Sequence, residues 1–521
     1  MTSRERWLLV IAAGLLGCLA VGTLFRHITP DLQPSKLRME GSANPYSTQE
    51  IRAFLDAAGN AEAIADPLQR CLDYPDLPGS HWSRAAVVAY CRNQLTPGIT
   101  FREVKTLIEA GRASAVERRM EELLQRQLAG SGTPGLLDAT YDLDFACTCS
   151  HTDVRPVVDA WKRQSPQSAF AYAASGVARV REAWDARGTA WAAETSQSKF
   201  EAMQRLSTEA ADDLQRAVAM DKRMMPAYAA MIRLAGLNGE REYALTAARR
   251  GLEIDPADYL IWSRLIWISQ PKWGGSIAAM QKVVAESQRH VMQNPLLLLL
   301  QHQADAVAAG FDDCGCTEDF DSSAFRAVFD QVIAKSWLGG AGLSANKVHQ
   351  EGTAVIYLSE ALRFAPQSTD YLVGRSNSLT SLGLHDWAVA DADRAIKLDP
   401  GAKTAWTARG YAYESVNDFV HAEQDFQHAL TLIPDDTWTL TELGRIYVYS
   451  THDWDKGWSV ANQLIQSHPE DPDGWIFRAS IQKDQPRPGL QDTIRYFIAH
   501  FGDDPQQQPV IAQMRPYLAQ H

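Results

Sequence analysis

Apolar residues recur every three or four positions along most of the chain, in stretches separated by short polar breaks. This spacing puts the apolar side chains on one face of a helix. A helix is predicted from Ser47, because Glu50 three residues later completes a capping-box pattern. Residues 101–130 predict two helices separated by Gly111. Few segments alternate with the period of a strand, so we expect an all-α fold.

The amino terminus has a different pattern, an uncharged run from Trp7 to Phe25. A helix of this length nearly matches the hydrocarbon core of a bilayer, about 30 Å. Arg4 and Arg6 precede it, which favours an amino terminus inside the cell. We therefore predict a single-pass anchor in the inner (cytoplasmic) membrane through residues 7–25, with the remaining chain in the periplasm of a bacterium.

Two alternatives remain open for this segment. A cleaved signal peptide would use the small residues 20–22 as its cleavage site. A lipoprotein would be acylated at Cys18, although the apolar run continues beyond that residue.

A repeat of 34 residues organises the carboxyl-terminal part of the chain. Counted from residue 403, positions 4, 8, 11, 20, 24, 27 and 32 are Trp406, Gly410, Tyr413, Ala422, Phe426, Ala429 and Pro434. Small residues at positions 8, 20 and 27 let two helices approach closely, large residues fill the space between them, and proline ends the second helix. This pattern resembles the tetratricopeptide repeat, except at Arg409, where the repeat has leucine. The resemblance covers residues 369–482 and, less regularly, 190–290, and it implies an α-solenoid of stacked helical hairpins.

A second resemblance covers residues 100–290. The segments "WKRQSPQSAFAYAASGVARVREAWDARG" and "QPKWGGS" are similar to an uncharacterised bacterial domain family. That family implies helices of this kind and no particular chemistry.

The predicted organisation follows from these patterns. It comprises a membrane segment (1–25), a linker (26–45), an irregular helical domain (46–300), a helical connector (301–350), tetratricopeptide repeats (351–485) and a capping helix (486–521).

Enzymatic motifs are missing from the sequence: it has no P-loop, no G-x-S-x-G and no H-E-x-x-H. The glycine-rich segment 336–347 lacks a phosphate-binding ending, and we interpret it as a loop. The net charge of −13 excludes a broad basic surface for nucleic acid. We expect no enzyme and no cofactor. One alternative is a helical-toroid enzyme acting on envelope polymers, which would need paired carboxylates, for which Asp142 and Asp144 are weak candidates. The other alternative is a metal or redox sensor that uses the C-x-C cysteines.

The cysteines predict disulfides in an oxidising compartment. Cys71 and Cys91 flank a loop with two prolines, and we expect them to pair. Cys147 and Cys149 form one C-x-C pair, and Cys314 and Cys316 form another. Cross-pairing of the two motifs, a metal site of four thiolates or of three thiolates with His151, a redox pair, and unpaired thiols all remain open.

The predicted partner-binding surface is the concave face of the repeats, lined by the first helix of each hairpin. The candidate residues are Asn377, Thr380, Thr404, Thr407, Tyr411, Glu414, Trp438, Thr441 and Arg445. Asn377 fits a carboxylate clamp, but Val373 stands where a clamp needs lysine. We therefore expect a membrane-anchored scaffold that binds a protein or peptide partner.

Overall fold

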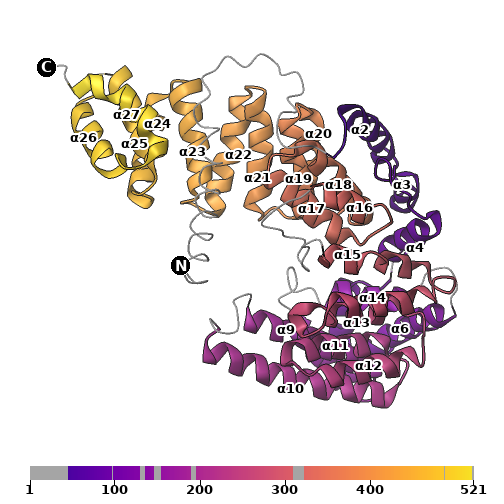
Figure 1. Ribbon diagram of the computed structural model, residues 1–521. Coiled ribbons are helices and arrows are strands. Elements are labelled where there is room, and N and C mark those ends of the chain that lie inside the picture. Colours follow the sequence, from indigo (N-terminus) through magenta and orange to yellow (C-terminus); the bar gives the residue numbers. More distant parts are fainter. Residues whose placement is uncertain are drawn as a thin grey trace, which may run out of the picture. The chain divides into compact units, whose positions relative to one another are not determined.

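The computed structural model describes residues 45–96, 98–129, 135–145, 154–188, 195–308, 322–485 and 487–518, and every element in these ranges is a helix (Figure 1). The helices form two compact units. We call residues 45–371 the amino-terminal unit and residues 372–518 the carboxyl-terminal unit. The units divide inside the predicted repeat domain, and the finer domain boundaries stay a prediction.

Before residue 369, the described residues of the amino-terminal unit form twenty helical elements. They are α2 (Thr48–Glu62), α3 (Pro67–Asp73), α4 (Arg84–Leu95), α5 (Phe101–Glu109), α6 (Ala113–Leu128), α7 (Leu136–Thr140), η2 (Tyr141–Phe145), α8 (Val154–Gln164), α9 (Ala169–Arg187), α10 (Gln197–Met220), α11 (Met225–Asn238), α12 (Arg241–Leu252), α13 (Tyr259–Ile268), η4 (Pro271–Trp273), α14 (Ile277–Gln288), η5 (Pro295–Leu300), α15 (Gln303–Ala308), α16 (Ser322–Val328), α17 (Lys335–Lys347) and α18 (Glu351–Phe364).

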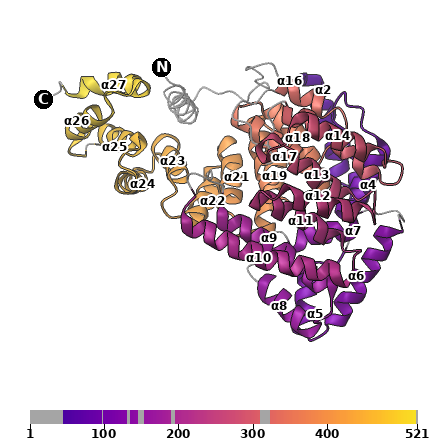
Figure 2. The same cartoon turned by 60° about the horizontal axis from the view of Figure 1, so that its bottom comes forward.

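The predicted helix starts are confirmed by their caps. Ser47 and Glu50 form the expected capping box at the start of α2. Thr100 and Glu103 form another at α5. Gly111 adopts a left-handed backbone with φ of 69°, which ends α5 and allows α6 to begin. Figure 2 shows α5, α6 and α8 gathered at one end of this unit.

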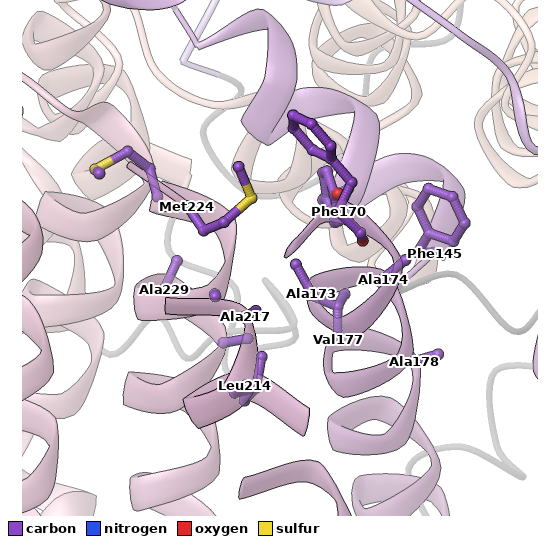
Figure 3. Close-up of a cluster of buried hydrophobic side chains, with 14 of the residues drawn as sticks. Phe145, Phe170, Ala173, Ala174, Val177, Ala178, Leu214, Ala217, Met224 and Ala229 are labelled. Atoms are coloured by element: carbon purple, nitrogen blue, oxygen red, sulfur yellow. Dashed lines mark hydrogen bonds between the residues drawn. The ribbon is translucent and has the colours of Figure 1, made fainter. Parts of the chain in front are cut away.

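The main core of this unit lies around α9 and α10, which run side by side in both views (Figures 1 and 2). The helices approach closely because α9 presents small residues such as Ala173 and Gly176. A Cβ atom at Gly176 would lie 2.6 Å from the Leu214 side chain of α10. Alanine, valine and methionine side chains from α9, α10 and α11 then fill the interior (Figure 3).

The amino-terminal unit closes on itself through contacts between distant segments. The indole nitrogen of Trp82 donates to the carbonyl of Phe329 at 2.9 Å. The Tyr46 and Tyr357 hydroxyls lie 3.4 Å apart, and their rings meet edge to face. These contacts pack the first helices of the unit, α2 to α4, against its last helix, α18.

A disulfide joins Cys71 of α3 to Cys91 of α4, as the sequence predicts, with an S–S distance of 2.08 Å. Both residues are buried, and the backbone carbonyl of Cys71 accepts a hydrogen bond from the buried Arg363 of α18 at 2.7 Å. The four cysteines of the two C-x-C motifs and His151 lie outside the described residues.

The prediction of a loop at residues 336–347 is wrong, because this segment is the helix α17. Its glycines allow close packing on neighbouring side chains: a Cβ at Gly342 would lie 2.6 Å from Leu358 of α18. Counted from Lys335, Gly342 holds position 8 of the 34-residue repeat, and Leu358 holds position 24. Helices α17 and α18 therefore form one more hairpin of the same kind.

The carboxyl-terminal unit consists of consecutive hairpins. Its elements are α19 (Thr369–Ser381, which crosses the boundary), α20 (His385–Leu398), α21 (Lys403–Ser415), α22 (Phe419–Leu432), α23 (Thr437–Arg445), η6 (Ile446–Ser450), α24 (Trp454–Ser467), α25 (Pro472–Asp484), α26 (Leu490–Phe501), η7 (Pro505–Gln507), α27 (Gln508–Met514) and η8 (Arg515–Leu518).

The repeat positions of this unit pack as the sequence predicts. A Cβ at Gly410 would lie 2.6 Å from the buried ring of Phe426, so only glycine allows this approach of α21 and α22. The indole nitrogen of Trp406 donates to the carbonyl of Pro400 at 2.9 Å. Trp475 and Pro469 repeat this bond at 3.3 Å, and Trp262 and Pro256 repeat it in the amino-terminal unit at 2.9 Å.

The departure at Arg409 has a structural reason. Its guanidinium makes two hydrogen bonds to the Asp425 carboxylate, of 2.8 and 2.7 Å. One repeat earlier, Arg375 makes the same double contact with Asp391, at 2.6 and 2.8 Å, and both residues are fully buried. An arginine at position 7 is thus accommodated by an aspartate at position 23 of the same hairpin.

The predicted placement as a single-pass inner-membrane protein with a periplasmic bulk needs correction. In the described ranges, no helix has the length and apolar character that crossing a bilayer requires. Even the longest of these helices, α10, carries charged residues such as Lys199 and Glu209. The segment 7–25, on which the prediction rested, lies outside the described residues. Membrane anchoring is therefore not supported.

Candidate functional site

Three of the predicted concave-face residues are buried inside the carboxyl-terminal unit. Thr380 donates to the carbonyl of Ser376 at 2.9 Å, and Thr407 donates to that of Thr404 at 3.1 Å. Thr441 donates to the Asp473 carboxylate at 3.2 Å. These hydroxyls stabilise the packed helices. The repeat pattern alone does not distinguish this structural role from partner binding.

The other candidates are at least partly accessible. Thr404 and Trp438 are exposed, whereas Asn377, Tyr411, Glu414 and Arg445 are half-buried. The Trp438 ring, which is 42% exposed, meets the ring of Phe426 edge to face at 5.8 Å. Their role in binding stays a prediction.

Glu414, Glu442 and Arg445 form a charged cluster on α21 and α23. Arg445 contacts Glu442 at 3.4 Å. Burial, and then the neighbouring Glu442, raise the pKa of Glu414 to about 8, while Arg445 opposes this shift. The Oε2 atom of Glu414 is buried and has no hydrogen-bond partner among the described residues. A donor supplied by a ligand would compensate this buried acceptor.

A second candidate site, which the sequence reasoning missed, is an open cavity of about 980 Å³ in the amino-terminal unit. Its walls come from α4, α7, η2, α9, α11, α13, η4, the start of α15 and the first turn of α17. This volume lies at the upper end of the range for pockets that bind small molecules.

Cationic side chains outnumber carboxyl groups around this cavity. The cations are Arg181, Arg187, Arg233, Arg264, Lys272 and Lys335, and the carboxyl groups are those of Asp138, Asp142 and Asp185. Arg264 donates to Asp142 at 2.7 Å, and Arg181 pairs with Asp185 at 3.0 Å.

Lys335 lies at the start of α17, where its backbone N–H donates to the Tyr90 hydroxyl at 2.9 Å. Its ammonium group donates to the side-chain carbonyl of Gln94. Burial lowers the pKa of Lys335 to about 8, and Asp142 opposes this shift. Lys335 is thus a cation held in a partly desolvated position.

Asp138 is the most buried carboxyl group of the cavity wall, and the buried carboxyl group of Asp258, the N-cap of α13, lies near it. Burial, and then Asp258, raise the pKa of Asp138 well above its usual value. Two neighbouring buried carboxyl groups disfavour each other's ionisation. Asp138 therefore adds little negative charge to the cavity.

An aromatic cluster forms another part of the wall. The rings of Trp267 and Trp273 lie 4.8 Å apart, and Trp184 meets both edge to face, at 6.0 and 5.8 Å. The ammonium group of Lys272 lies 5.7 Å from the centre of the Trp273 ring.

The sequence did carry a signal for this cavity. The segments AWDARG and WGG were noted only for their resemblance to a family, and they contribute Trp184, Arg187 and Trp273 to the same wall. In contrast, Trp161 and Ser168 from the start of the same family pattern are structural: Trp161 is fully buried, and Ser168 caps α9. Of the weak carboxylate candidates, Asp142 is paired with Arg264, and the side chain of Asp144 lies outside the description.

Comparisons with known proteins agree with both resemblances. Residues 100–247 match the family described as a domain of unknown function (DUF4034). A relative in Mycosarcoma maydis, the small glutamine-rich tetratricopeptide repeat-containing protein 2, is 28% identical over 108 residues. The match spans 20% of this chain and 31% of that relative, which is less than a third of its length.

Solved structures of tetratricopeptide proteins also align with the chain. The tetratricopeptide domain of P58(IPK) aligns with 11% identity and a TM-score of 0.20, covering 60% of this chain and 93% of that one. Yeast Tom70 aligns with 11% identity and a TM-score of 0.27, covering 80% and 87%. Both scores are below 0.5, so neither alignment describes the arrangement of the whole chain. The chain is therefore similar to tetratricopeptide-repeat proteins, and its residues 100–247 match the DUF4034 family.

Proposed function

We propose that the protein is a non-enzymatic scaffold that binds a protein or peptide partner on the concave face of its carboxyl-terminal unit. Helical-repeat folds of this kind present an extended face made of the first helix of each hairpin. The helices α19, α21, α23 and α25 hold these places here.

The observation that supports the proposal best is the cluster around Glu414. A buried carboxyl oxygen with no hydrogen-bond partner among the described residues is costly unless a ligand supplies one. Tyr411 lies one helical turn before Glu414, and Tyr449 follows α23. Half-exposed tyrosines beside a polar anchor are common where proteins bind partners. A segment that carries backbone N–H groups or a basic side chain fits this cluster.

The proposal is tested by crosslinked capture with full-length wild type and a Tyr411→Ala, Glu414→Leu double variant. The matched control is Val420→Ser on α22, because Val420 is 66% exposed and belongs to a second helix of a hairpin. We expect the double variant to lose specific partners that both the wild type and the control retain. Identical sets of captured proteins from all three would contradict the proposal.

A further inference from the structure

We propose that the cavity of the amino-terminal unit binds a small organic anion in which a phosphate or carboxylate is attached to a ring. This site is separate from the concave face and does not depend on the function proposed for it.

The charges that line the cavity indicate that its ligand is an anion. Six cationic side chains line it in a chain whose net charge is −13. Of the three carboxyl groups, Asp142 is held by Arg264, Asp185 is held by Arg181, and Asp138 is buried against Asp258. The lining therefore offers more cationic groups than ionised carboxylates. Such a lining attracts an anionic ligand, and guanidinium groups suit phosphate and carboxylate oxygens.

The aromatic wall carries the second step. Trp184, Trp267 and Trp273 gather beside Lys272, so an apolar wall adjoins the cationic lining. Indole rings pack on flat or ring-shaped ligands, and inorganic phosphate alone would not use them. The ligand is therefore expected to combine an anionic group with a ring.

The size of the site carries the third step. A cavity of about 980 Å³ is large enough for a ligand such as a nucleotide or a sugar phosphate. A nucleotide and a sugar phosphate share the required chemistry, so the experiment must distinguish them. An acidic peptide is a different class of ligand and is treated as an opposing outcome.

The test is calorimetric titration of the full chain at constant ionic strength with ADP, glucose 1-phosphate, inorganic phosphate and a hexaglutamate peptide. We expect ADP or glucose 1-phosphate to bind at least tenfold more tightly than phosphate. Whichever of these two ligands binds more tightly identifies the kind of ring that the cavity accepts. The proposal is overturned if neither binds more tightly than phosphate, or if hexaglutamate binds more tightly than both.

Variants locate the binding. Lys335→Met removes a cation of the cavity, and we expect it to weaken binding of the ring-containing anion about tenfold or more. Trp273→Leu should weaken binding of the ring-containing anion and leave binding of inorganic phosphate unchanged. The control is Arg205→Gln, because Arg205 is an exposed residue of α10 that changes the net charge equally but lies outside the cavity lining.

An equal loss from Arg205→Gln and Lys335→Met would show non-specific attraction and would sink the proposal. If Lys335→Met does not fold, as judged by its circular dichroism, Arg233→Gln replaces it. On wild type, quenching of tryptophan fluorescence by ADP but not by phosphate gives an independent readout of ring binding at the aromatic wall.

Discussion

In the carboxyl-terminal unit each helix packs mainly on the helix that precedes or follows it, from α20 through α26. In the amino-terminal unit, helices near residues 46–95 pack on α18, although most of the unit separates them in the sequence. Both units use the same hairpin, with glycine at position 8 facing a large residue at position 24 (Gly342 and Leu358, Gly410 and Phe426).

The difference teaches that a local repeat pattern does not determine how an array ends. A linear stack stabilises each hairpin through its neighbours, so its stability is approximately a sum of local terms. A unit that closes on itself depends on contacts between distant segments, and in the amino-terminal unit the departures from the repeat leave room for a cavity. The comparison can be tested by changes that should act on one unit or on both.

The largest effect is expected from breaking the buried ion pair of α19 and α20. Asp391→Ala leaves the fully buried Arg375 guanidinium without its double contact, and removal of one partner of such a pair costs about 3–5 kcal/mol. Urea unfolding with hydrogen exchange read out at α19 and α20 measures this loss.

The matched control is the double variant Arg375→Leu, Asp391→Leu. Leucine occupies position 7 of a later copy, at Leu443, so the double variant should recover most of the lost stability. A single variant that unfolds within 1 kcal/mol of wild type would argue against this account.

A smaller effect, confined to the other unit, is expected from the disulfide. Replacing both Cys71 and Cys91 by serine releases a loop of 20 residues, which costs about 3 kcal/mol by chain-entropy estimates. Hydrogen exchange should increase in α3, α4 and the α18 segment that they contact, and it should not change in α21 and α22. Reductant on the wild type should reproduce the same pattern.

The third change tests what the two units share. Gly410→Ala and Gly342→Ala each place a Cβ 2.6 Å from a packed side chain, and overpacking of this kind costs about 1–3 kcal/mol. Gly401→Ala is the control, because Gly401 is exposed and its Cβ would meet only a flexible carboxylate at 3.3 Å. Thermal melts that rank Gly401→Ala as the most damaging of the three would refute the shared hairpin geometry.

The last prediction concerns pH and the concave face. Because the folded-state pKa of Glu414 is raised to about 8, its burial is tolerated while the carboxyl group is protonated. The stability that it contributes is fully present below its unfolded pKa near 4.5 and is lost as pH rises through about 8.

Glu414→Gln should therefore unfold at higher urea concentration than wild type at pH 8, with little difference at pH 4.5. One pKa unit corresponds to about 1.4 kcal/mol, so even part of this shift is measurable. A variant that gains the same stability at both pH values would show that the carboxyl group does not titrate in this window.

The sequence predicted those features that depend on local pattern. The cap at Ser47, the break at Gly111 and the hairpin around Gly410 follow from residues a few positions apart or in a fixed register. The helix α17 was missed because glycine has low helix propensity, whereas here Gly342 packs closely on Leu358 of α18 and Gly339 packs closely on Tyr371.

The cavity could not be derived in the same way. Trp184, Trp273 and Lys335 come from three elements up to 151 positions apart, and no spacing rule connects them. Arg409 was recognised as a departure, but its partner Asp425 could have been found, since Arg375 and Asp391 repeat the pair 34 residues earlier. The repeat itself contained this information.

The closure of the amino-terminal unit also bears on how the protein is made. Tyr46 meets Tyr357 across 311 positions, so this contact must wait until nearly all of the unit has left the ribosome. At about 5–20 residues per second, translation of this stretch takes roughly 15–60 s. During that time residues 46–95 present apolar side chains such as that of Trp82 without their final cover, while the short Cys71–Cys91 loop is already complete. The nascent amino-terminal unit should therefore depend on chaperones, whereas the carboxyl-terminal hairpins can fold one after another as they emerge.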